Sequence, residues 1–492
     1  MAGLANSGWS ALLGLAVVPF YLKYLGIEAY GLIGFFVTLQ AMLGLLDMGM
    51  TPTINREVAR CSASGKLHEA GPLLHTLAVV YWSVAIAISF LIACFAAAIA
   101  QHWLHSKQLS QQTVLHAVML MGLVVACRWP IGLYQGAMSG AQRLILSSAI
   151  SITMATIGSL GAVAVLAFVS PTIEAFFIWQ ACVGLVYAVT TRMAAWRVIG
   201  TSRKNPFAVG YIRRIWRFSL SVSAISLAGL ALTQMDKLIL SKTLGLEGFG
   251  NYMLATLVAS SLYILIVPFF NAIYPRFSAL VVQKNDDALL QLYRGAGNLM
   301  AVMLFPASMT IILLSQDLIG LWTGNAALGA SVAPVASILL AAYALHGVMY
   351  IPYALMLAYG ETRSMYRIYG PLIIGIVPLT IMLSLQNGAI GGALAQLLLF
   401  VVYAVFGTWI THKRFLKGWA RTWLSKEVGL PLGISVAVGV VGYLVLPKVG
   451  DAWYLKLSAG MAFWVVAAAL SIQFSRYSRL IFVRYWNQFC YR

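Results

Sequence analysis

Residues 23–31 read Lys-Tyr-Leu-Gly-Ile-Glu-Ala-Tyr-Gly, and residues 242–250 read Lys-Thr-Leu-Gly-Leu-Glu-Gly-Phe-Gly. Five of the nine positions are identical, and each copy lies between two long apolar runs. At an offset larger by one residue, Arg56 matches Arg276 and residues 140–143 match residues 360–363. Landmarks that keep one register over about 120 residues indicate an internal duplication. We therefore interpret each copy as a tight turn between two helices of a parallel repeat.

The composition is that of a membrane protein. The chain is 61% hydrophobic and only 9% charged, which excludes an ordinary soluble protein. Apolar runs of about 20 residues recur along it, each long enough to cross a hydrocarbon core of roughly 30 Å. The sequence thus predicts an all-α polytopic membrane protein. A parallel repeat in such a chain is typical of transporters, whose site lies at the interface of the two halves.

About fourteen transmembrane helices are expected. They form two six-helix bundles related by the internal parallel repeat, followed by two extra C-terminal helices without a counterpart. The expected domains are 1–200, the N-terminal bundle; 201–216, a basic cytoplasmic linker; 217–415, the C-terminal bundle; and 416–492, the two additional helices with a basic amphipathic tail. The expected spans are 4–22, 30–50, 73–100, 113–138, 145–168, 173–195, 217–240, 249–272, 297–315, 332–358, 368–385, 389–411, 428–446 and 454–474.

The distribution of positive charge predicts the orientation. Of the 32 Lys and Arg residues, 25 fall in alternate connections and in the C-terminal tail, six lie in or beside the other connections, and Arg128 alone lies inside a span. Positive residues accumulate on the cytoplasmic side of membrane proteins. Both termini are therefore expected in the cytoplasm, and the net charge of +19 needs no nucleic-acid partner. The first apolar run begins almost at Met1, so we expect no cleavable signal peptide.

Several short motifs resemble those of a known family. Residues 45–50 read Leu-Leu-Asp-Met-Gly-Met, and residues 56–59 read Arg-Glu-Val-Ala. This resembles the Asp-x-Gly and Arg-x-x-Ala pattern of bacterial polysaccharide flippases, the Wzx-type exporters of the multidrug/oligosaccharidyl-lipid/polysaccharide (MOP) superfamily. The likeness covers roughly residues 1–415. Further similar stretches are the opening at 6–9, Gly-x-Gln-Arg at 140–143, and Asp-Lys-Leu at 236–238 leading into 244–252.

The resemblance implies a function and a set of partners. It implies two bundles around a central lumen, alternating access, and export of undecaprenyl-diphosphate-linked oligosaccharide across the bacterial inner membrane for O-antigen or exopolysaccharide synthesis. Phospholipid surrounds such a protein, and a polysaccharide polymerase and a chain-length regulator are candidate partners. Neither catalysis nor a cofactor is implied. The chain departs from the family in lacking a basic stretch before the first helix, and its fourteen spans are more like the peptidoglycan-precursor flippases.

Arg128 is the sharpest candidate for substrate binding. It lies near the middle of the fourth span, where an Arg costs about 2.5–3.5 kcal/mol on insertion scales and is functional by default. Its planar guanidinium matches the oxygens of a phosphate with two hydrogen bonds. Gln135, seven residues further on, faces the same way and is a possible second donor. The alternative is a structural ion pair inside the bundle.

Two further pairs of polar residues lie in or near spans. Asp47 lies near the cytoplasmic end of the second span, with Gln40 seven residues earlier on the same face. Either these two residues line the lumen, or Asp47 is a helix cap or a partner for Arg56. Asp236 and Lys237 lie toward the outer end of the seventh span. Adjacent helical residues point about 100° apart, so we expect only one of them to face the lumen.

The remaining candidates are weaker. Arg56 and Arg276 are repeat-related and lie on the inner side, where they either attract the diphosphate or anchor the helices. His346 in the tenth span and Asp236 are candidates for coupling to ions, because a His titrates near neutral pH. A lone helical His more often makes only a hydrogen bond. The five cysteines form no paired or metal-binding pattern, so no metal site is expected.

Two other functions stay open beside a flippase. A drug extruder or a peptidoglycan-lipid transporter of the same superfamily would share the fold, but a cationic drug favours a carboxylate-rich lumen and intramembrane acids are few here. A membrane polymerase or ligase needs a sizeable outer loop to hold its catalytic groups. The longest outer segment, about residues 316–331, carries one charge, on Asp317. The sequence shows neither a phosphate-binding loop nor a nucleophile motif.

Overall fold

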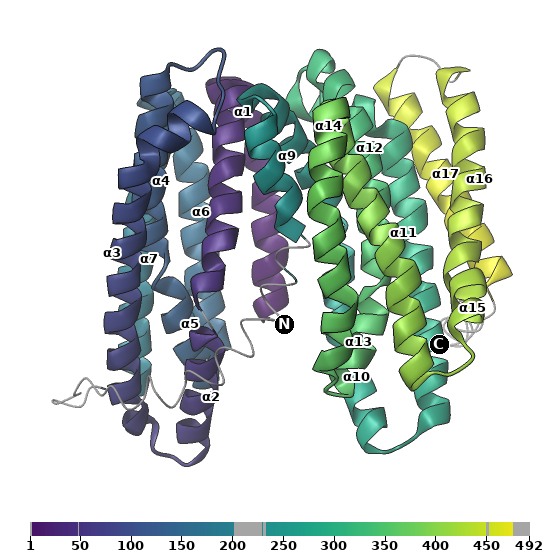
Figure 1. The fold of residues 1–492 in the computed structure, drawn as a ribbon, viewed down its shortest axis with the longest axis horizontal. Coiled ribbons are helices and arrows are strands. Elements are labelled where there is room, and N and C mark those ends of the chain that lie inside the picture. Colours follow the sequence, from purple (N-terminus) through teal and green to yellow (C-terminus); the bar gives the residue numbers. More distant parts are fainter. Residues whose placement is uncertain (1, 48, 201–228, 230–232, 449–451, 476–492) are drawn as a thin grey trace. The chain divides into compact units, whose positions relative to one another are not determined.

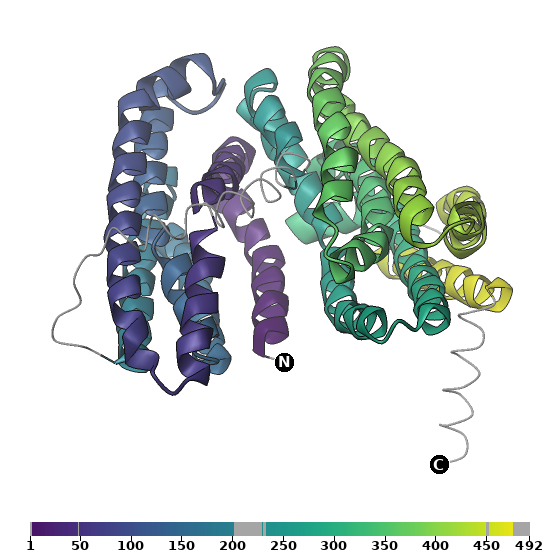
Figure 2. The same ribbon diagram turned by 60° about the horizontal axis from the view of Figure 1, so that its bottom comes forward.

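The computed structural model describes residues 2–47, 49–200, 229, 233–448 and 452–475. All regular structure in these residues is helical (Figure 1, Figure 2). Eleven of the described helices are long and apolar enough to cross a membrane. The chain forms two compact units, Met1–Gly250 and Asn251–Arg492, called unit 1 and unit 2 below. The expectation of an all-α multi-pass membrane protein is confirmed.

Unit 1 contains the first nine helical elements and ends with the start of α9. Residues 233–243 are also helical. The elements are α1 (Ala2–Leu43), η1 (Gly44–Asp47), α2 (Met50–Ala63), η2 (Leu67–Ala70), α3 (Gly71–His102), α4 (Gln111–Arg128), α5 (Ile131–Gly140), α6 (Leu144–Phe168), α7 (Ile173–Ile199) and α9 (Leu246–Ser260).

Unit 2 contains the rest of α9, the remaining long helices and the appended C-terminal pair. One of its short elements, η3, is π-helical. The elements are α10 (Tyr263–Val282), α11 (Asp286–Thr323), α12 (Ala326–Val348), α13 (Tyr350–Ala358), α14 (Thr362–Phe415), α15 (Ala420–Thr422), η3 (Trp423–Gly429), α16 (Leu430–Val445), η4 (Leu446–Lys448) and α17 (Trp453–Phe474).

Two of the helices each combine two expected spans. α1 is broken at Gly26, where φ is 78°, and returns to the end from which it started (Figure 1). α14 is broken at Gly388, where φ is 57°. There the chain doubles back so tightly that a Cβ on Gly391 would lie 1.8 Å from the Leu383 carbonyl oxygen. Counting both halves of each gives thirteen of the fourteen expected spans within the described residues. The other, 217–240, lies mostly outside them.

Side-chain caps set several helix starts. The Ser110 hydroxyl accepts the backbone N–H of Thr113 at 3.1 Å and begins α4, and Thr172 begins α7 in the same way. The Asn285 and Asn325 amide oxygens each accept a backbone N–H three residues on, at 3.1 Å, and begin α11 and α12. These side chains satisfy N–H groups that have no partner within the first turn.

The helix bounds keep the register of the repeat. α4 ends at Arg128 and the chain is irregular at Trp129 and Pro130, while α12 ends at Val348 and the chain is irregular at Met349. The two breaks are therefore 220 residues apart, the offset of the sequence matches. Pro130 contributes to the first break, because a proline has no N–H for the helical ladder.

The two copies of the repeated turn lie in direct contact within unit 1. A Cβ on Gly31 would lie 2.4 Å from the Leu246 carbonyl oxygen, and a Cβ on Gly250 would lie 2.4 Å from the Ile27 carbonyl oxygen. Gly31 and Gly250 occupy equivalent positions of the repeat, as do Ile27 and Leu246. The contact is thus reciprocal, and it explains why both copies carry glycine where the two backbones meet.

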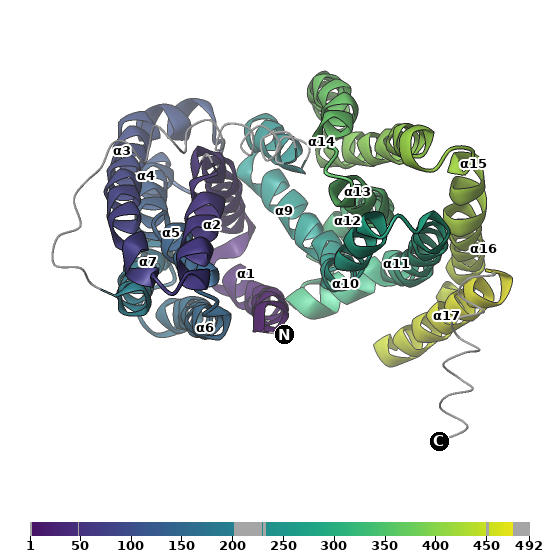
Figure 3. The ribbon, with the colours of Figure 1, turned by 90° about the horizontal axis from the view of Figure 1, so that it is seen from below.

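The appended helices α16 and α17 lie beside α11 (Figure 3). Small residues and one ion pair make the contact. A Cβ on Gly439 or Gly460 would meet side-chain atoms of α11 within 2.4 Å, so these glycines allow close helix approach. Arg294 on α11 donates to the Glu427 carboxylate in η3, at 2.6 Å from Nε. The pair connects the appended helices to the rest of unit 2.

Candidate functional site

A polar cavity of about 570 Å³ lies inside unit 1, among α1, α4, α5, α6 and α7. This volume lies within the usual range for small-molecule sites. Polar side chains from all five helices line it although these helices are apolar overall. The polar lining residues are Asn6, Ser10, Gln40, Arg128, Gln135, Ser151, Ser159, Gln180 and Tyr187.

Arg128 supplies the positive charge of the cavity. It is the last residue of α4, immediately before the break at Trp129 and Pro130. Its guanidinium donates to Gln180 Oε1 at 2.5 Å, and its Cζ lies 5.8 Å from the centre of the Phe36 ring. Gly184 leaves room for the Arg128 side chain, because a Cβ there would lie 3.1 Å from Arg128 Cγ. The helix break and this glycine together place the guanidinium in the cavity.

The charge of Arg128 is not neutralised by a carboxylate within the described residues, whose ion pairs involve other cations. The span Gln111–Gly140 carries Arg128 as its single formal charge. The guanidinium has five N–H donors, and its bond to Gln180 engages one nitrogen. The geometry does not support the structural ion pair considered from the sequence, and it leaves a cation facing a polar cavity.

A second hydrogen-bonded group lines the cavity beside Arg128. Gln135 Nε2 donates to Tyr187 Oη at 2.6 Å and to Ser151 Oγ at 2.8 Å, and Tyr187 Oη donates to Ser151 Oγ at 2.7 Å. Arg128 and Gln135 are seven residues apart, and so are their partners Gln180 and Tyr187 on α7. The structure therefore brings Arg128, Gln135 and Gln40 to one cavity. Sequence reasoning missed Gln180, Tyr187 and Ser151, although polar residues seven apart on α7 are a usable signal.

Asp47 lies away from the cavity and stabilises the start of α2. The expected span 30–50 ends as a regular α-helix at Leu43, and Asp47 is the last residue of the short helix η1 that follows. Its carboxylate accepts the Thr51 N–H at 3.2 Å and the Thr51 hydroxyl at 2.7 Å, and it also accepts the Tyr81 hydroxyl. Of the roles considered for Asp47, that of a cap fits this geometry.

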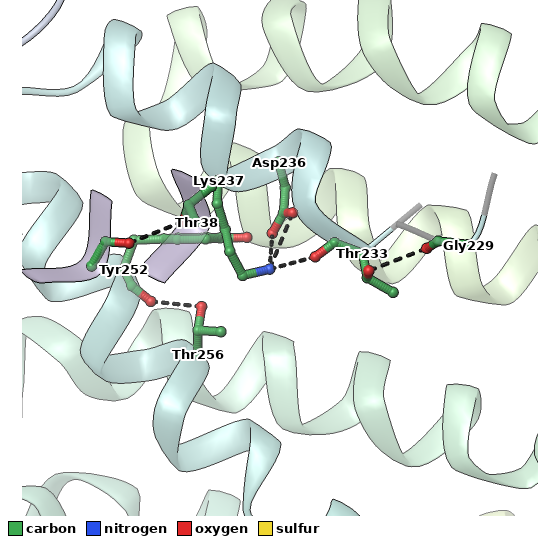
Figure 4. Close-up of polar contacts among 8 residues, drawn as sticks. Thr38, Gly229, Thr233, Asp236, Lys237, Tyr252 and Thr256 are labelled. Carbon is green, nitrogen blue, oxygen red and sulfur yellow. Dashed lines mark hydrogen bonds and ion pairs between the residues drawn. The ribbon is translucent and has the colours of Figure 1, made fainter. Parts of the chain in front are cut away.

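Asp236 and Lys237 form a buried pair (Figure 4). Lys237 Nζ lies 3.2 Å and 3.3 Å from the two Asp236 carboxylate oxygens, and it donates to the Thr233 carbonyl oxygen at 2.7 Å. The charged groups of the two neighbours meet each other although their Cα–Cβ bonds diverge. The Cα–Cβ bonds of neighbours diverge by about 100°, but the flexible lysine side chain bends back to its neighbour. Neither residue lines the cavity.

The remaining predicted residues also lie outside the cavity. Arg56 on α2 is exposed and lies 3.2 Å from the Glu57 carboxylate, and Arg276 on α10 is exposed. His346 on α12 lies within an aromatic cluster of unit 2, where its Nδ1 is 2.8 Å from Tyr263 Oη and its ring is stacked on Phe400 at 4.2 Å.

The described chain offers no cluster of three or more His, Cys, Asp or Glu side chains that could hold a metal ion. Cys61 on α2 is free, and burial raises the pKa of its thiol. That shift disfavours the thiolate, the form in which cysteine binds metals.

Comparison with known proteins gives the family and the fold. A family model described as "Polysaccharide biosynthesis protein" matches residues 4–281. The fold is similar to that of the lipid II flippase MurJ in an inward closed conformation, with a TM-score of 0.70, 15% identity, and coverage of 95% of this chain and 98% of that one. No curated protein sequence matches the chain.

Two other solved structures share the fold. One is a multidrug resistance MATE family transporter of the MOP superfamily in an inward-facing conformation, with a TM-score of 0.66, 14% identity, and coverage of 82% of this chain and 95% of that one. The other is a MOP superfamily transporter from Pyrococcus furiosus whose binding pocket has reverse polarity. Its TM-score is 0.54 with 13% identity, over 86% of this chain and 95% of that one.

The described helices define a multi-pass membrane protein with the fold that MurJ and the MATE transporters share. The chain belongs to the polysaccharide biosynthesis protein family, whose model matches more than half of its length.

Proposed function

We propose that the protein flips undecaprenyl-diphosphate-linked oligosaccharide repeat units from the cytoplasmic to the outer leaflet of the bacterial inner membrane, by alternating access. The exported units serve O-antigen or exopolysaccharide synthesis. One observation carries the proposal: a guanidinium without a carboxylate partner among the described residues, Arg128, faces a polar cavity between membrane-spanning helices.

The chemistry of the cavity suits a phosphate joined to a sugar. A diphosphate is anionic and rich in acceptors, and an Arg fork binds such groups by charge-assisted hydrogen bonds. The Gln135 and Gln180 amides and the Tyr187 hydroxyl add polar groups that can exchange their bonds within the wall for bonds with sugar hydroxyls. Asn6 Oδ1 is buried in the cavity wall without a hydrogen-bond partner in the described residues. An acceptor of this kind fits a sugar hydroxyl.

The cavity does not favour a drug extruder. A cationic drug needs negative charge in its site, whereas the lining among the described residues contains one cation and no Asp or Glu. A peptidoglycan lipid carries the same diphosphate, and the match to the lipid II flippase covers 95% of this chain, a share that requires the appended C-terminal helices. Transport of a peptidoglycan lipid is therefore the second candidate function. The two candidate substrates differ in the sugar that the diphosphate carries.

The test is transport by Arg128 variants in a strain lacking its own flippase. Arg128→Ala should abolish most export and weaken binding of undecaprenyl diphosphate by purified protein at least about 10-fold, the loss expected for a charged hydrogen bond. Arg128→Lys should retain part of both, because the charge stays but the fork is lost. Arg421→Ala, which removes an exposed Arg on α15, is the matched control and should behave as wild type.

Export is measured per folded molecule, and the accumulated lipid-linked sugar is analysed by mass spectrometry. An Arg128→Ala protein with normal export and normal diphosphate binding would overturn the proposed role of the cavity. Rescue of a strain that lacks its peptidoglycan-lipid flippase, without rescue of polysaccharide export, would establish the second candidate instead.

A further inference from the structure

Four half-buried aromatic rings contact one another in unit 2, and they are here called the aromatic strip. It consists of Phe270 and Tyr274 on α10 and Tyr350 and Tyr353 on α13. Phe270 is central: its ring is nearly parallel to Tyr274, at 5.9 Å and 2°, and to Tyr353, at 5.9 Å and 23°. Tyr350 meets Phe270 edge-on at 5.6 Å. Tyr274 and Tyr353 thus lie nearly parallel to Phe270 and equally far from it.

Helix geometry and a second layer of rings hold the strip in place. Positions 270 and 274 are four residues apart and share a face of α10, and 350 and 353 share a face of α13. Behind them, Tyr263 lies 6.1 Å from Tyr350 and its hydroxyl is 2.8 Å from His346 Nδ1. His346 in turn stacks on the buried Phe400. The half-buried rings are therefore positioned in advance of any ligand, which lowers the entropic cost of binding.

Packing alone does not require these rings. At the offset of 220, the four strip positions correspond in unit 1 to Met50, Ile54, Pro130 and Leu133, none of them aromatic. The equivalent helices α2 and α5 pack together with these side chains, and Ile54 and Leu133 are fully buried there. The same helix pair has therefore been built with aliphatic residues in one unit and with aromatic residues in the other. A role beyond packing accounts for the difference.

We propose that the aromatic strip binds the saccharide part of the transported lipid. A pyranose has faces of polarised C–H bonds and a rim of hydroxyls. The negative face of an aromatic ring attracts the C–H bonds, and a tyrosine hydroxyl at the ring edge bonds to the rim. The substrate class rests on the proposed function, but the strip and its neutral chemistry are independent of the cationic cavity in unit 1.

The arrangement of the rings favours a sugar over an organic cation. A cation-binding cage directs several ring faces at one point. Here Tyr353 and Tyr274 lie nearly parallel to Phe270, so the ring faces do not converge on one point. Half-buried rings that carry tyrosine hydroxyls suit the C–H faces and the hydroxyls of sugar rings.

The test measures binding of two natural lipids to the purified full chain: the lipid-linked repeat unit extracted from host membranes, and sugar-free undecaprenyl diphosphate. Tyr353→Leu should weaken binding of the repeat unit about 10-fold, the upper range for one aromatic contact, and should leave binding of undecaprenyl diphosphate unchanged. Tyr353→Phe keeps the ring and should lose no more than about 3-fold. Phe270→Leu provides a second variant with the same expectation as Tyr353→Leu.

Tyr359→Leu is the matched control, because Tyr359 directly follows α13 and stacks on Phe415 at 4.4 Å, outside the strip. It should bind both lipids as wild type does. An equal loss for both lipids in Tyr353→Leu and Phe270→Leu would show a structural role and overturn the proposal, as would unchanged binding of both. Strip-dependent binding of tetraphenylphosphonium, without a sugar-dependent effect, would assign the strip to cations and also overturn it.

Free oligosaccharide released from the repeat unit separates this proposal from the proposed function. If wild type binds neither lipid, the proposed function fails, while the strip is still tested by the free sugar. Binding of that sugar lost in Tyr353→Leu and kept in Tyr359→Leu supports the strip. Sugar binding that is equal in the two variants overturns it.

Discussion

Two cations inside unit 1 are held in different ways. Lys237 is buried beside the Asp236 carboxylate, so that pair is neutral. Arg128 bonds to the neutral Gln180 amide and keeps its charge in the cavity. An unneutralised guanidinium within a span is costly, about 2.5–3.5 kcal/mol on insertion scales, and such a cost is tolerated where function needs the charge. A buried cation therefore stabilises the fold at Lys237 and, by our proposal, binds the substrate at Arg128.

At the residue scale, Asp236→Asn should destabilise the protein strongly, because it leaves the Lys237 ammonium buried without its carboxylate. Breaking one side of a buried pair costs about 3–5 kcal/mol. The double variant Asp236→Leu with Lys237→Met should regain most of that stability, since both charges are gone. Thermal unfolding in detergent measures both, and an Asp236→Asn protein as stable as wild type would contradict a structural role for the pair.

At the scale of elements, the duplicated turn is maintained by a contact between its own two copies. Gly31 packs on the Leu246 carbonyl oxygen, and Gly250 packs on that of Ile27. Because equivalent positions exchange equivalent contacts, a side chain at either glycine disturbs the same interface. The buried Glu28 has a different role: its carboxylate accepts the backbone N–H groups of residues 107–109, at 2.9–3.2 Å.

Gly31→Ala and Gly250→Ala should therefore each destabilise the protein by about 1–3 kcal/mol, the usual cost of overpacking. Gly8→Ala is the matched control on α1, since a Cβ there meets no atom within 4 Å. Melting temperatures of the three variants provide the measurement. Equal stability of Gly31→Ala and Gly8→Ala would show that the two turns are not in contact.

At the scale of the whole molecule, the charge distribution and the long helices together predict sidedness. α11 runs for 38 residues without interruption from Asp286 to Thr323, so the residues flanking it lie on opposite sides of the membrane. Residues 273–296 belong to the basic segments assigned to the cytoplasm by the excess of Lys and Arg.

Gln283→Cys should accordingly react with a membrane-impermeant maleimide only after the cells are permeabilised, whereas Ala327→Cys should react in intact cells. Both positions are exposed and flank the same helix. Labelling in the opposite sense would reverse the proposed orientation and the direction of export inferred from it.

The sequence was sufficient for the class of protein and for most of its helices. Apolar length predicted the spans, because a helix must cross a fixed hydrocarbon thickness with its backbone groups paired internally. Asn285 and Asn325 begin their helices through local hydrogen bonds, which involve residues only three apart. The exact ends of the helices were harder to predict. The second span ends at Leu43 and is followed by η1, because Asp47 of η1 bonds to Tyr81, a residue distant in sequence.

The cavity depended on tertiary structure. Sequence identified Arg128, Gln135 and Gln40 because polar groups are rare in apolar spans, but a helical period shows which residues share a face and not which helix that face meets. Gln180 and Tyr187 join the site across 52 residues, through the packing of α4 and α5 against α7. The same limit applied to Lys237, whose long flexible side chain reaches a neighbour that its Cβ points away from. Local chemistry thus determined the elements, and long-range packing decided which of their polar groups share a site.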